Sequence, residues 1–346
     1  MSTPDLVGVL TTIQPPTACV WRLAEVLAAR GAPLLVVGDR KGPEHFALPG
    51  AQFYPLAEQQ RLPFALARRL PVGHYSRKNL AYLLAVARGA GCIYETDDDN
   101  MPSPAWQVRP LVVEAQAVAA RPWMNVYAAF SERHVWPRGF PLERVADPAT
   151  RAHDPAGPAR PVAAPVQQGL ADLAPDVDAV WRLTLDGELY FRPGPSLWLP
   201  PGTWCPFNSQ TTWWWPPAYP LLYLPSHVSF RMTDIWRGFV AQRCLWELGY
   251  GLVFHGPEAI QERKQHDLLR DFRDEVPGYL NNHEIARRLA ALALAPGSGA
   301  VRDNLVRCYE GLAAGGLLPD DELPLVRAWV EDLGGAEAAA PEGRAA

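Results

Sequence analysis

The sequence predicts an α/β protein in which a mixed, mostly parallel sheet is flanked by helices and followed by a helical C-terminal region. Two short apolar runs, "DLVGVL" (5–10) and "PLLVVGD" (33–39), are typical of strands buried on both faces of a parallel sheet. Segments with apolar residues on one helical face lie between these runs and after them, so strand and helix alternate. The alternation favours a doubly wound sheet, in which ligands bind beyond the carboxyl ends of the strands.

The first strand–helix–strand unit covers residues 5–39. Its helix is expected in "ACVWRLAEVLAARG" (18–31), where Leu23 and Leu27 share one face. Gly31 stands just after this segment, at the position where helices usually end.

A second unit repeats the pattern and ends in a run of acids. Its helix is expected in "SRKNLAYLLAVARGAG" (76–91), and the strand "CIYET" (92–96) follows directly. Thr11, Asp39 and Asp97 each stand at the end of a predicted strand. Because the carboxyl ends of parallel strands meet at one edge of the sheet, we expect a ligand site there.

The remaining sequence differs in composition from one stretch to the next. Residues 143–168 are rich in Pro and Ala without periodicity, which predicts a long, mobile surface loop. Residues 198–230 are dense in aromatic residues and prolines. A helix is expected at 233–249 and a strand at 250–255, and residues 258–334 are expected to be mostly helical.

Composition indicates a globular protein without a nucleic-acid partner. The chain has 346 residues, 48% of them hydrophobic, and a formal net charge of -5. Its five cysteines are scattered singly without a CxxC pair, which favours reduced thiols over a zinc site. The N-terminal residues lack the features of a signal peptide, and no apolar run is long enough to span a bilayer. We therefore expect a cytoplasmic protein; peripheral contact with the inner membrane face and a homo-oligomeric state stay open.

The acidic turn "DDD" (97–99) is the most informative short stretch. Three adjacent carboxylates repel one another, and burying one costs several kcal/mol unless a positive partner is near. A solvated turn that caps the next element is one interpretation. A calcium loop is a second, but its spacing fails, because the sixth position is Pro102 and the twelfth is Val108.

A metal site is the third interpretation of the acidic turn. In an extended turn the alternate residues Asp97 and Asp99 can point the same way and share one ion. Carboxylate oxygens suit Mg²⁺ or Mn²⁺, which usually keep open positions for waters and substrate phosphates.

Several longer phrases resemble the STELLO family of glycosyltransferases, known from plant Golgi proteins associated with cellulose synthase. They occur in the expected order between about residues 5 and 285: "VLTTIQPPT", "LLVVGDRKGP", "YETDDDN", "PFNSQTTWWWPPAYPLLYLP", "VSFRMTDIWRGFVAQRCLW" and "RDFRDEVPGY". The resemblance implies a GT-A (nucleotide-diphospho-sugar transferase) fold, a UDP-type sugar donor and Mn²⁺ or Mg²⁺. "TDIWRGF" is also similar to a segment of plant UDP-arabinopyranose mutase-like proteins.

The resemblance also suggests a division of the chain. The expected parts are a GT-A-like domain at 1–285 with a nucleotide-binding half at 1–100 and a donor/acceptor half at 198–256, a helical extension at 286–334, and a disordered tail at 335–346.

The resemblance assigns nucleotide contacts to the first half of the chain. Thr11, Thr12 and Ile13 are expected beneath the nucleoside, and Asp39 is expected to accept hydrogen bonds from the base or ribose. Arg77 and Asn79 in "SRKN" are expected to hold the uracil or the diphosphate; the alternative is an ordinary solvated helix start. Asp97 and Asp99 are expected to bind the metal, and Asp98 to reach the donor sugar.

The second half supplies the candidates for catalysis and sugar binding. Asp234 is the candidate general base that accepts the proton of the acceptor hydroxyl; the alternative is a helix N-cap. Amides, a guanidinium and flat aromatic side chains suit sugar hydroxyls and ring faces, and they predict contacts from Asn208, Gln210, Trp213, Trp215, Arg231 and Trp236. Adjacent tryptophans in an extended chain point opposite ways, so at least one is expected in the core.

Two histidines are candidates for a third metal ligand. His255 ends a predicted strand, and His266 lies in "RKQHDLL". The alternative for each is a hydrogen-bonded structural histidine.

The function predicted from the sequence is metal-dependent sugar transfer from a UDP-type donor to a glycan, a lipid-linked sugar or another hydroxyl. A non-catalytic module that binds nucleotide sugar or scaffolds a polysaccharide-synthesis complex is a second interpretation, and a nucleotide-sugar mutase is a third. A nucleotidyltransferase is disfavoured, because "TTIQPPT" lacks the Gly-rich, basic first loop of those enzymes.

Overall fold

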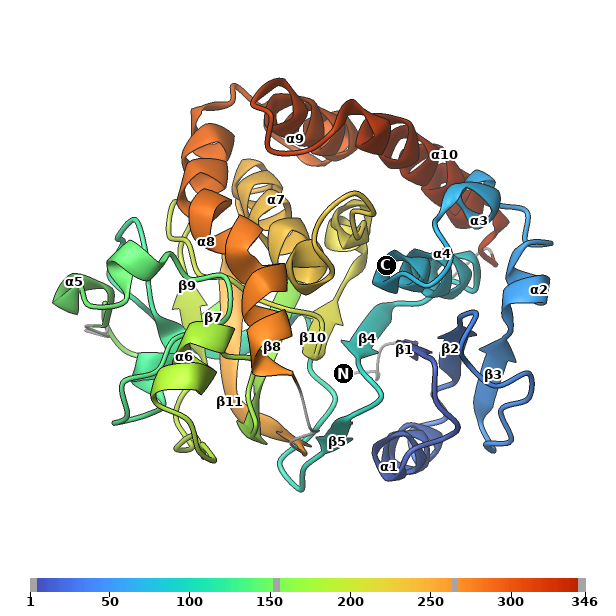
Figure 1. Cartoon of the computed structure of the whole chain (residues 1–346), viewed down its shortest axis with the longest axis horizontal. Coiled ribbons are helices and arrows are strands. Elements are labelled where there is room, and N and C mark those ends of the chain that lie inside the picture. The colour runs from blue at the N-terminus through green and yellow to red at the C-terminus, as the bar shows by residue number, and fades with distance from the viewer. Residues whose placement is uncertain (1–4, 152–155, 263–266, 342–346) are drawn as a thin grey trace.

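A computed structural model describes residues 5–151, 156–262 and 267–341 (Figure 1). The strands within these residues are β1 (Leu6–Thr12), β2 (Leu34–Gly38), β3 (Ala51–Tyr54), β4 (Cys92–Thr96), β5 (Asn100–Pro102), β6 (Val112–Ala117), β7 (Arg160–Ala163), β8 (Val166–Leu173), β9 (Leu197–Leu199), β10 (Thr211–Trp214) and β11 (Leu252–Gln261). The helices are α1 (Ala18–Ala28), α2 (Leu56–Gln59), α3 (Ala65–Arg69), α4 (Asn79–Ala87), α5 (Pro148–Arg151), α6 (Ala179–Thr184), α7 (Thr233–Glu247), α8 (Leu268–Ala291), α9 (Val301–Ala314) and α10 (Leu323–Ala339).

The strands of the described residues form one mixed sheet in the order β3-β2-β1-β4-β10-β8-β11-β9-β6-β7, with β5 paired to β11. The first four strands in this order are parallel to one another. β10 is antiparallel to both of its neighbours, and β8 and β11 are parallel. The prediction of an α/β protein with a mixed, mostly parallel sheet between helices is confirmed.

Side-chain alternation explains why β1 and β2 are apolar over most of their length. Leu10, Val36 and Tyr94 pack in one cluster with the buried face of α1, whereas Val9 and Val37 pack in a second cluster with α4. Successive residues of a strand point to opposite faces, so helices on both faces favour apolar residues at successive positions. Thr17 caps α1 by accepting a hydrogen bond from the Val20 backbone at 3.2 Å.

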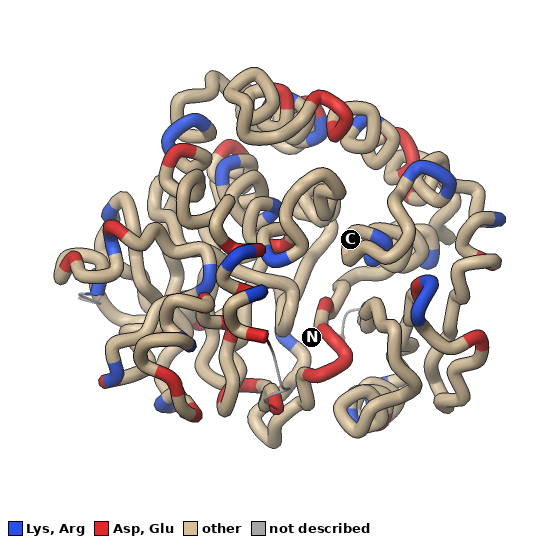
Figure 2. The backbone as a smooth tube through the Cα atoms, in the orientation of Figure 1, with Lys and Arg blue, Asp and Glu red and all other residues tan. Residues whose placement is uncertain are grey.

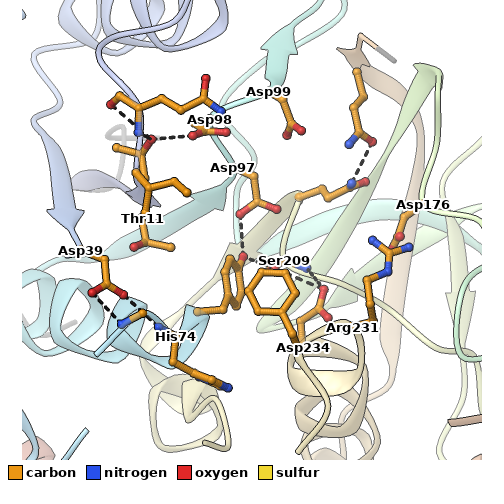
Figure 3. A pocket seen from close by; sticks show the side chains of 18 of the residues that line it. Thr11, Asp39, His74, Asp97, Asp98, Asp99, Asp176, Ser209, Arg231 and Asp234 are labelled. Carbon is orange, nitrogen blue, oxygen red and sulfur yellow. Dashed lines mark hydrogen bonds between the residues drawn. The ribbon is translucent and has the colours of Figure 1, made fainter. Parts of the chain in front are cut away.

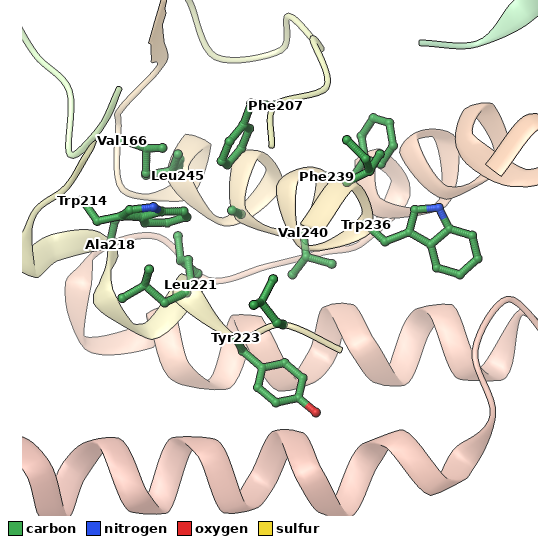
Figure 4. Packing of buried hydrophobic residues seen from close by; sticks show 14 of the residues in the cluster. Val166, Phe207, Trp214, Ala218, Leu221, Tyr223, Trp236, Phe239, Val240 and Leu245 are labelled. Carbon is green, nitrogen blue, oxygen red and sulfur yellow. The ribbon is translucent and has the colours of Figure 1, made fainter. Parts of the chain in front are cut away.

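The three adjacent tryptophans of 213–215 are all buried. Trp213 packs against Tyr94 on the α1 face, whereas Trp214 packs on the opposite face, beside α7 (Figure 4). Trp215 is only 3% exposed. The alternation follows the prediction, but the expected sugar contacts of Trp213 and Trp215 are wrong, because both indoles are packed in the core.

The last two helices pack onto earlier helices of the chain instead of standing apart. α10 lies against α3 and α4, and α9 lies against α7 (Figure 1). The carboxylate of Asp332 accepts hydrogen bonds from the backbone N–H groups of Ala65 and Leu66, each at 2.8 Å. These contacts join both ends of the described chain into one core.

Two expected boundaries differ from the structure. α10 continues to Ala339, five residues into the range expected to be a disordered tail. The segment 143–168, expected to be a loop, contains α5, β7 and the start of β8 in its described residues. β7 is rich in Pro and Ala, and it is an edge strand paired only to β6 among the described residues, a position that tolerates proline. No helix in the described ranges combines the length and apolar character needed to cross a membrane.

Candidate active site

A cavity of about 490 Å³ opens at the carboxyl ends of β1, β2 and β4 (Figure 3). This volume is in the range typical of small-molecule sites. The cavity brings together many of the residues predicted from the sequence: Thr11, Thr12, Ile13, Asp39, Asp97, Asp98, Asp99, Gln210, Arg231 and Asp234. Strand ends distant in the sequence therefore converge on one site.

The three aspartates of the acidic turn have different neighbours. Asp97 accepts hydrogen bonds from the Tyr75 hydroxyl at 2.6 Å and from Nζ of Lys78 at 2.9 Å. Asp98 accepts a hydrogen bond from the Thr12 hydroxyl, and Asp99 accepts one from the Asn100 side-chain amide at 3.0 Å. Figure 2 shows the turn as a continuous acidic segment after β4. Each of the three carboxylates therefore has hydrogen-bond partners of its own.

Lys78 provides the positive charge that this turn requires. Its side chain is fully buried, and Nζ also donates to the Thr96 carbonyl at 2.7 Å. Burial raises the pKa of Asp97 to about 6, although the charge of Lys78 opposes the rise. One lysine therefore offsets part of the charge of three aspartates, and the turn stays strongly acidic.

The donor set of the turn fits an ion that completes its coordination with substrate and water. Among the described residues, no group of three His, Cys, Asp or Glu side chains is placed to enclose a metal. Mg²⁺ and Mn²⁺ do not need such a cage, because one or two carboxylates plus phosphate oxygens suffice. Asp97 and Asp99 supply two carboxylates on the cavity wall.

Asp39 holds the loop that carries His74 and Tyr75 into the cavity. Its carboxylate accepts hydrogen bonds from the backbone N–H of Gly73 at 2.8 Å and of His74 at 2.9 Å. Gly73 has φ +76°, a left-handed conformation that favours glycine. Asp39 thus has a structural role that the sequence did not reveal, and its contact with a base or ribose stays a prediction.

On the other side of the cavity, Arg138 joins two aspartates. Its guanidinium donates to Asp176 at 2.7 and 2.9 Å and to Asp234 at 3.0 and 3.1 Å. Asp234 also accepts from the Ser209 backbone N–H at 3.3 Å. These bonds engage both oxygens of each carboxylate.

Asp234 is not the N-cap of α7. The N-cap is Met232, and Asp234 lies within the first turn. Burial alone would raise the pKa of Asp234, but the ion pair with Arg138 holds the pKa below its usual value. Because a carboxylate of low pKa is a weak base, this environment favours binding and orientation over proton abstraction.

Two predicted nucleotide contacts are wrong, because the side chains are buried away from the cavity. Arg77 is 1% exposed and donates to the Gln59 side chain at 2.7 Å and to the Leu70 carbonyl at 3.2 Å. Asn79 bonds the backbone N–H and carbonyl of Leu224 at 2.8 and 2.9 Å. Both side chains fix backbone segments.

Two predicted sugar contacts also lie outside the cavity lining. The side-chain amide of Asn208 donates to Asp176 at 2.9 Å and so helps to hold the carboxylate that pairs with Arg138. Trp236 is 4% exposed, and its indole N–H donates to Asn282 at 2.9 Å. Gln210 does line the cavity, where its amide donates to Gln261 at 2.8 Å.

His255 is a structural histidine. Its ring nitrogens contact the Ser196 hydroxyl at 2.7 Å and the Gln167 side chain at 2.8 Å, and neither partner lines the cavity. Burial lowers the pKa of His255 well below its usual value, so the imidazole is neutral. His266 lies outside the described residues.

Several residues that line the cavity or lie behind its wall were not predicted from the sequence. Tyr75 and Lys78 are close to Arg77 in the sequence. In the helical turn Tyr75–Lys78, the side chains of Tyr75 and Lys78 reach the acidic turn, whereas that of Arg77 does not. Asp176 follows the end of β8, so its strand-end position was a usable signal. Arg138 lies in a segment without periodicity, and nothing in the sequence pointed to it.

Comparison with known proteins supports the predicted resemblance. A family model described as STELLO glycosyltransferases matches residues 231–341. Over 333 residues, 90% of this chain, the sequence is 28% identical to the probable glycosyltransferase STELLO1 of Arabidopsis thaliana. STELLO2 of the same plant is likewise 28% identical over 342 residues. The resemblance to STELLO proteins is confirmed.

The STELLO match is partial in extent. The chain spans 42% of the length of each Arabidopsis protein. The family model begins at Arg231 and covers α7 and the C-terminal helices, whereas the similarity to the two STELLO proteins extends over 90% of the chain.

Proposed function

We propose that this protein is a metal-dependent glycosyltransferase that moves a sugar from a UDP-type donor to a hydroxyl acceptor. The observation that carries the proposal is the meeting, in one cavity, of the acidic turn with the ends of β1 and β2. The names of the two STELLO relatives support sugar transfer. The parallel run β3-β2-β1-β4 followed by an antiparallel β10 is compatible with the GT-A fold that we propose.

In this proposal the residues divide the work between the two sides of the cavity. Thr11, Thr12 and Ile13 bind the nucleoside beside the loop held by Asp39. Asp97 and Asp99 hold the divalent ion, which when bound stabilises the negative charge of the departing diphosphate. Arg138 and Asp234 orient the sugar or the acceptor through fixed polar groups. The chain thereby places donor and acceptor in a defined geometry.

The proposal is tested by thermal unfolding with a panel of nucleotide sugars, each with and without Mn²⁺. A ligand that binds the native state raises its melting temperature by mass action. We expect a UDP-sugar with Mn²⁺ to stabilise the wild type and to lose this effect in Asp99→Ala. Asp321→Ala, at an exposed aspartate of the C-terminal region, is the matched control.

Two outcomes of this test are decisive. Failure of every UDP-sugar to shift the melting temperature in the presence of Mn²⁺ would reject the proposal. Stabilisation without any release of UDP would instead indicate a protein that binds nucleotide sugar without transferring it.

A further inference from the structure

Three arginines line the side of the cavity that faces away from the nucleoside residues. This arginine wall consists of Arg138, Arg182 and Arg231. In Figure 3, Arg231 lies beside Asp176 and Asp234, across the cavity from Asp39 and His74. The wall comes from segments far apart in the sequence, so only the fold brings these charges together.

Two arginines of the wall, Arg138 and Arg231, form ion pairs with neighbouring carboxylates. Arg138 holds Asp176 and Asp234, with closest contacts of 2.7 and 3.0 Å. Arg231 donates through Nε and Nη2 to one oxygen of the buried Glu275, at 2.9 and 2.7 Å. The Nη1 atom of Arg231 takes no part in these bonds.

Arg182 is bound differently. Its Nη2 donates to the Pro175 carbonyl at 3.2 Å and its Nε to the Val177 carbonyl at 3.4 Å. Neither acceptor carries a charge, and Arg182 forms no ion pair with any carboxylate of the described residues. Burial, and after it the charge of Arg231, lower the pKa of Arg182, whereas the carboxylates of Asp176, Glu275 and Asp271 oppose this change. Arg182 and Arg231 therefore lie within electrostatic reach of each other.

We infer that the arginine wall is a subsite for an oxyanion on the acceptor, bound by Arg182 and Arg231. The inference rests on the proposed function, since it names the class of acceptor. Guanidinium groups present forks of N–H donors that match phosphate and carboxylate oxygens. Both arginines line the cavity, and the hydrogen bonds of their guanidinium groups to described residues use Nε and Nη2.

Phe230 adds a second property to this subsite. Its ring is 57% exposed, lines the cavity and precedes Arg231 in the chain. An exposed aromatic ring in a cavity that two guanidinium groups also line suits an organic anion, whose carbon skeleton packs on the ring, better than a free inorganic ion. A phosphomonoester and a sugar carboxylate both have this chemistry.

The experiment measures anion binding without nucleotide or metal, so that the acidic turn takes no part. Wild-type protein in EDTA is titrated calorimetrically with glycerol 3-phosphate and with glucuronate, and with glycerol and glucose as neutral counterparts. We expect saturable binding of at least one anion and none of the neutral compounds. Arg182→Gln should weaken that binding about tenfold or more, because a charged, forked donor is lost.

Matched variants separate the subsite from the fold. Arg192→Gln removes an exposed arginine that pairs with Glu132 at the surface, and it should bind the anion as the wild type does. Arg182→Lys keeps the charge without the fork and should bind with intermediate affinity. Arg182→Gln loses two contacts with backbone carbonyls. If it fails to fold, the affinity of Arg182→Lys for the anion tests the subsite instead: affinity equal to that of the wild type would overturn it.

The outcomes distinguish this inference from the proposed function. Absence of anion binding, or equal binding by Arg182→Gln, overturns the oxyanion subsite, whereas binding of UDP with Mn²⁺ is measured independently in the same proteins. Loss of both UDP and anion binding in folded Arg182→Gln also overturns it, because Arg182 would then serve the nucleotide. Anion binding without UDP binding supports the subsite and rejects the proposed function. Glycerol 3-phosphate and glucuronate tell phosphate from carboxylate.

Discussion

The Tyr75 hydroxyl connects the acidic turn to the opposite side of the cavity. It lies 2.6 Å from Asp97 Oδ1, 2.8 Å from Lys78 Nζ and 2.5 Å from the Ser209 hydroxyl. Ser209 in turn donates to Asp234 at 3.3 Å. Burial and the charge of Asp97 raise the pKa of Tyr75 well above its usual value, so the hydroxyl keeps its proton as a donor. One hydrogen-bonded network therefore connects Asp97 of the acidic turn to Asp234.

Tyr75→Phe tests whether the hydrogen bonds of the Tyr75 hydroxyl position Asp97 for the reaction. The ring and its edge contact with Phe230 are retained, and only the hydroxyl is lost. We expect the rate of UDP release from the donor to fall roughly tenfold, because Asp97 loses one of its fixed donors. The affinity for UDP should change less than the rate. Tyr190→Phe, at a tyrosine that is 61% exposed, is the control; equal effects in both variants would contradict this role.

At the scale of secondary structure, we expect the free energy of unfolding to depend on pH through Asp178. It is the N-cap of α6 and accepts hydrogen bonds from the Trp181 backbone at 2.8 Å and the Trp136 indole at 2.6 Å. Burial raises its pKa from 3.8 to about 7. The folded state therefore binds a proton more tightly than the unfolded state does. The contribution of protonated Asp178 to the free energy of unfolding is complete below about pH 4 and is lost as the pH rises towards about 7.

Asp178→Asn should remove this dependence while keeping a capping side chain. Urea unfolding of both proteins between pH 5 and pH 7 measures it. We expect the free energy of unfolding of the wild type to fall more steeply with pH than that of the variant. The difference in slope is at most about 1.4 kcal/mol per pH unit, the effect of one proton. Parallel curves would show that Asp178 has an ordinary pKa.

The elements could be predicted where local pattern and tertiary structure agree. The βαβ units at the start of the chain follow from apolar runs such as 33–39 and from the spacing of Leu23 and Leu27, and strand ends correctly placed Thr11, Asp39 and Asp97 at one cavity. β7 could not be predicted, because its proline-rich sequence is tolerated only at an edge whose position depends on β6.

The candidate site was less predictable than the fold. Arg77 and Lys78 are adjacent and both basic, and only the direction of one helical turn decides that Lys78 reaches Asp97. Likewise, Asp234 met the sequence criteria for a base, but it pairs with Arg138, which is 96 residues away in the sequence. Such contacts are properties of the packed fold.

At the scale of the whole molecule, Asp332 connects the last helix to the N-terminal half. It is 8% exposed and satisfies the two N–H groups at the start of α3. Asp332→Ala leaves these donors buried without an acceptor, and we expect a loss of about 1–3 kcal/mol in unfolding free energy. The cavity is formed by other elements, so UDP binding should persist.

The control for Asp332 is its exposed neighbour, Glu331→Ala. Urea denaturation monitored by tryptophan fluorescence measures both variants. A loss in Asp332→Ala no larger than in the control would show that α10 is held by apolar packing alone.

In the proposed function, Asp97 and Asp99 hold the diphosphate of a sugar donor through a divalent ion. The most direct measurement is the rate of UDP release from UDP-sugars with Mn²⁺, compared between the wild type and Asp99→Ala. We predict measurable release by the wild type, abolished by EDTA, and a loss of roughly a hundredfold or more in the variant. Equal rates in the two proteins, or release that EDTA leaves unchanged, would contradict this role of Asp97 and Asp99.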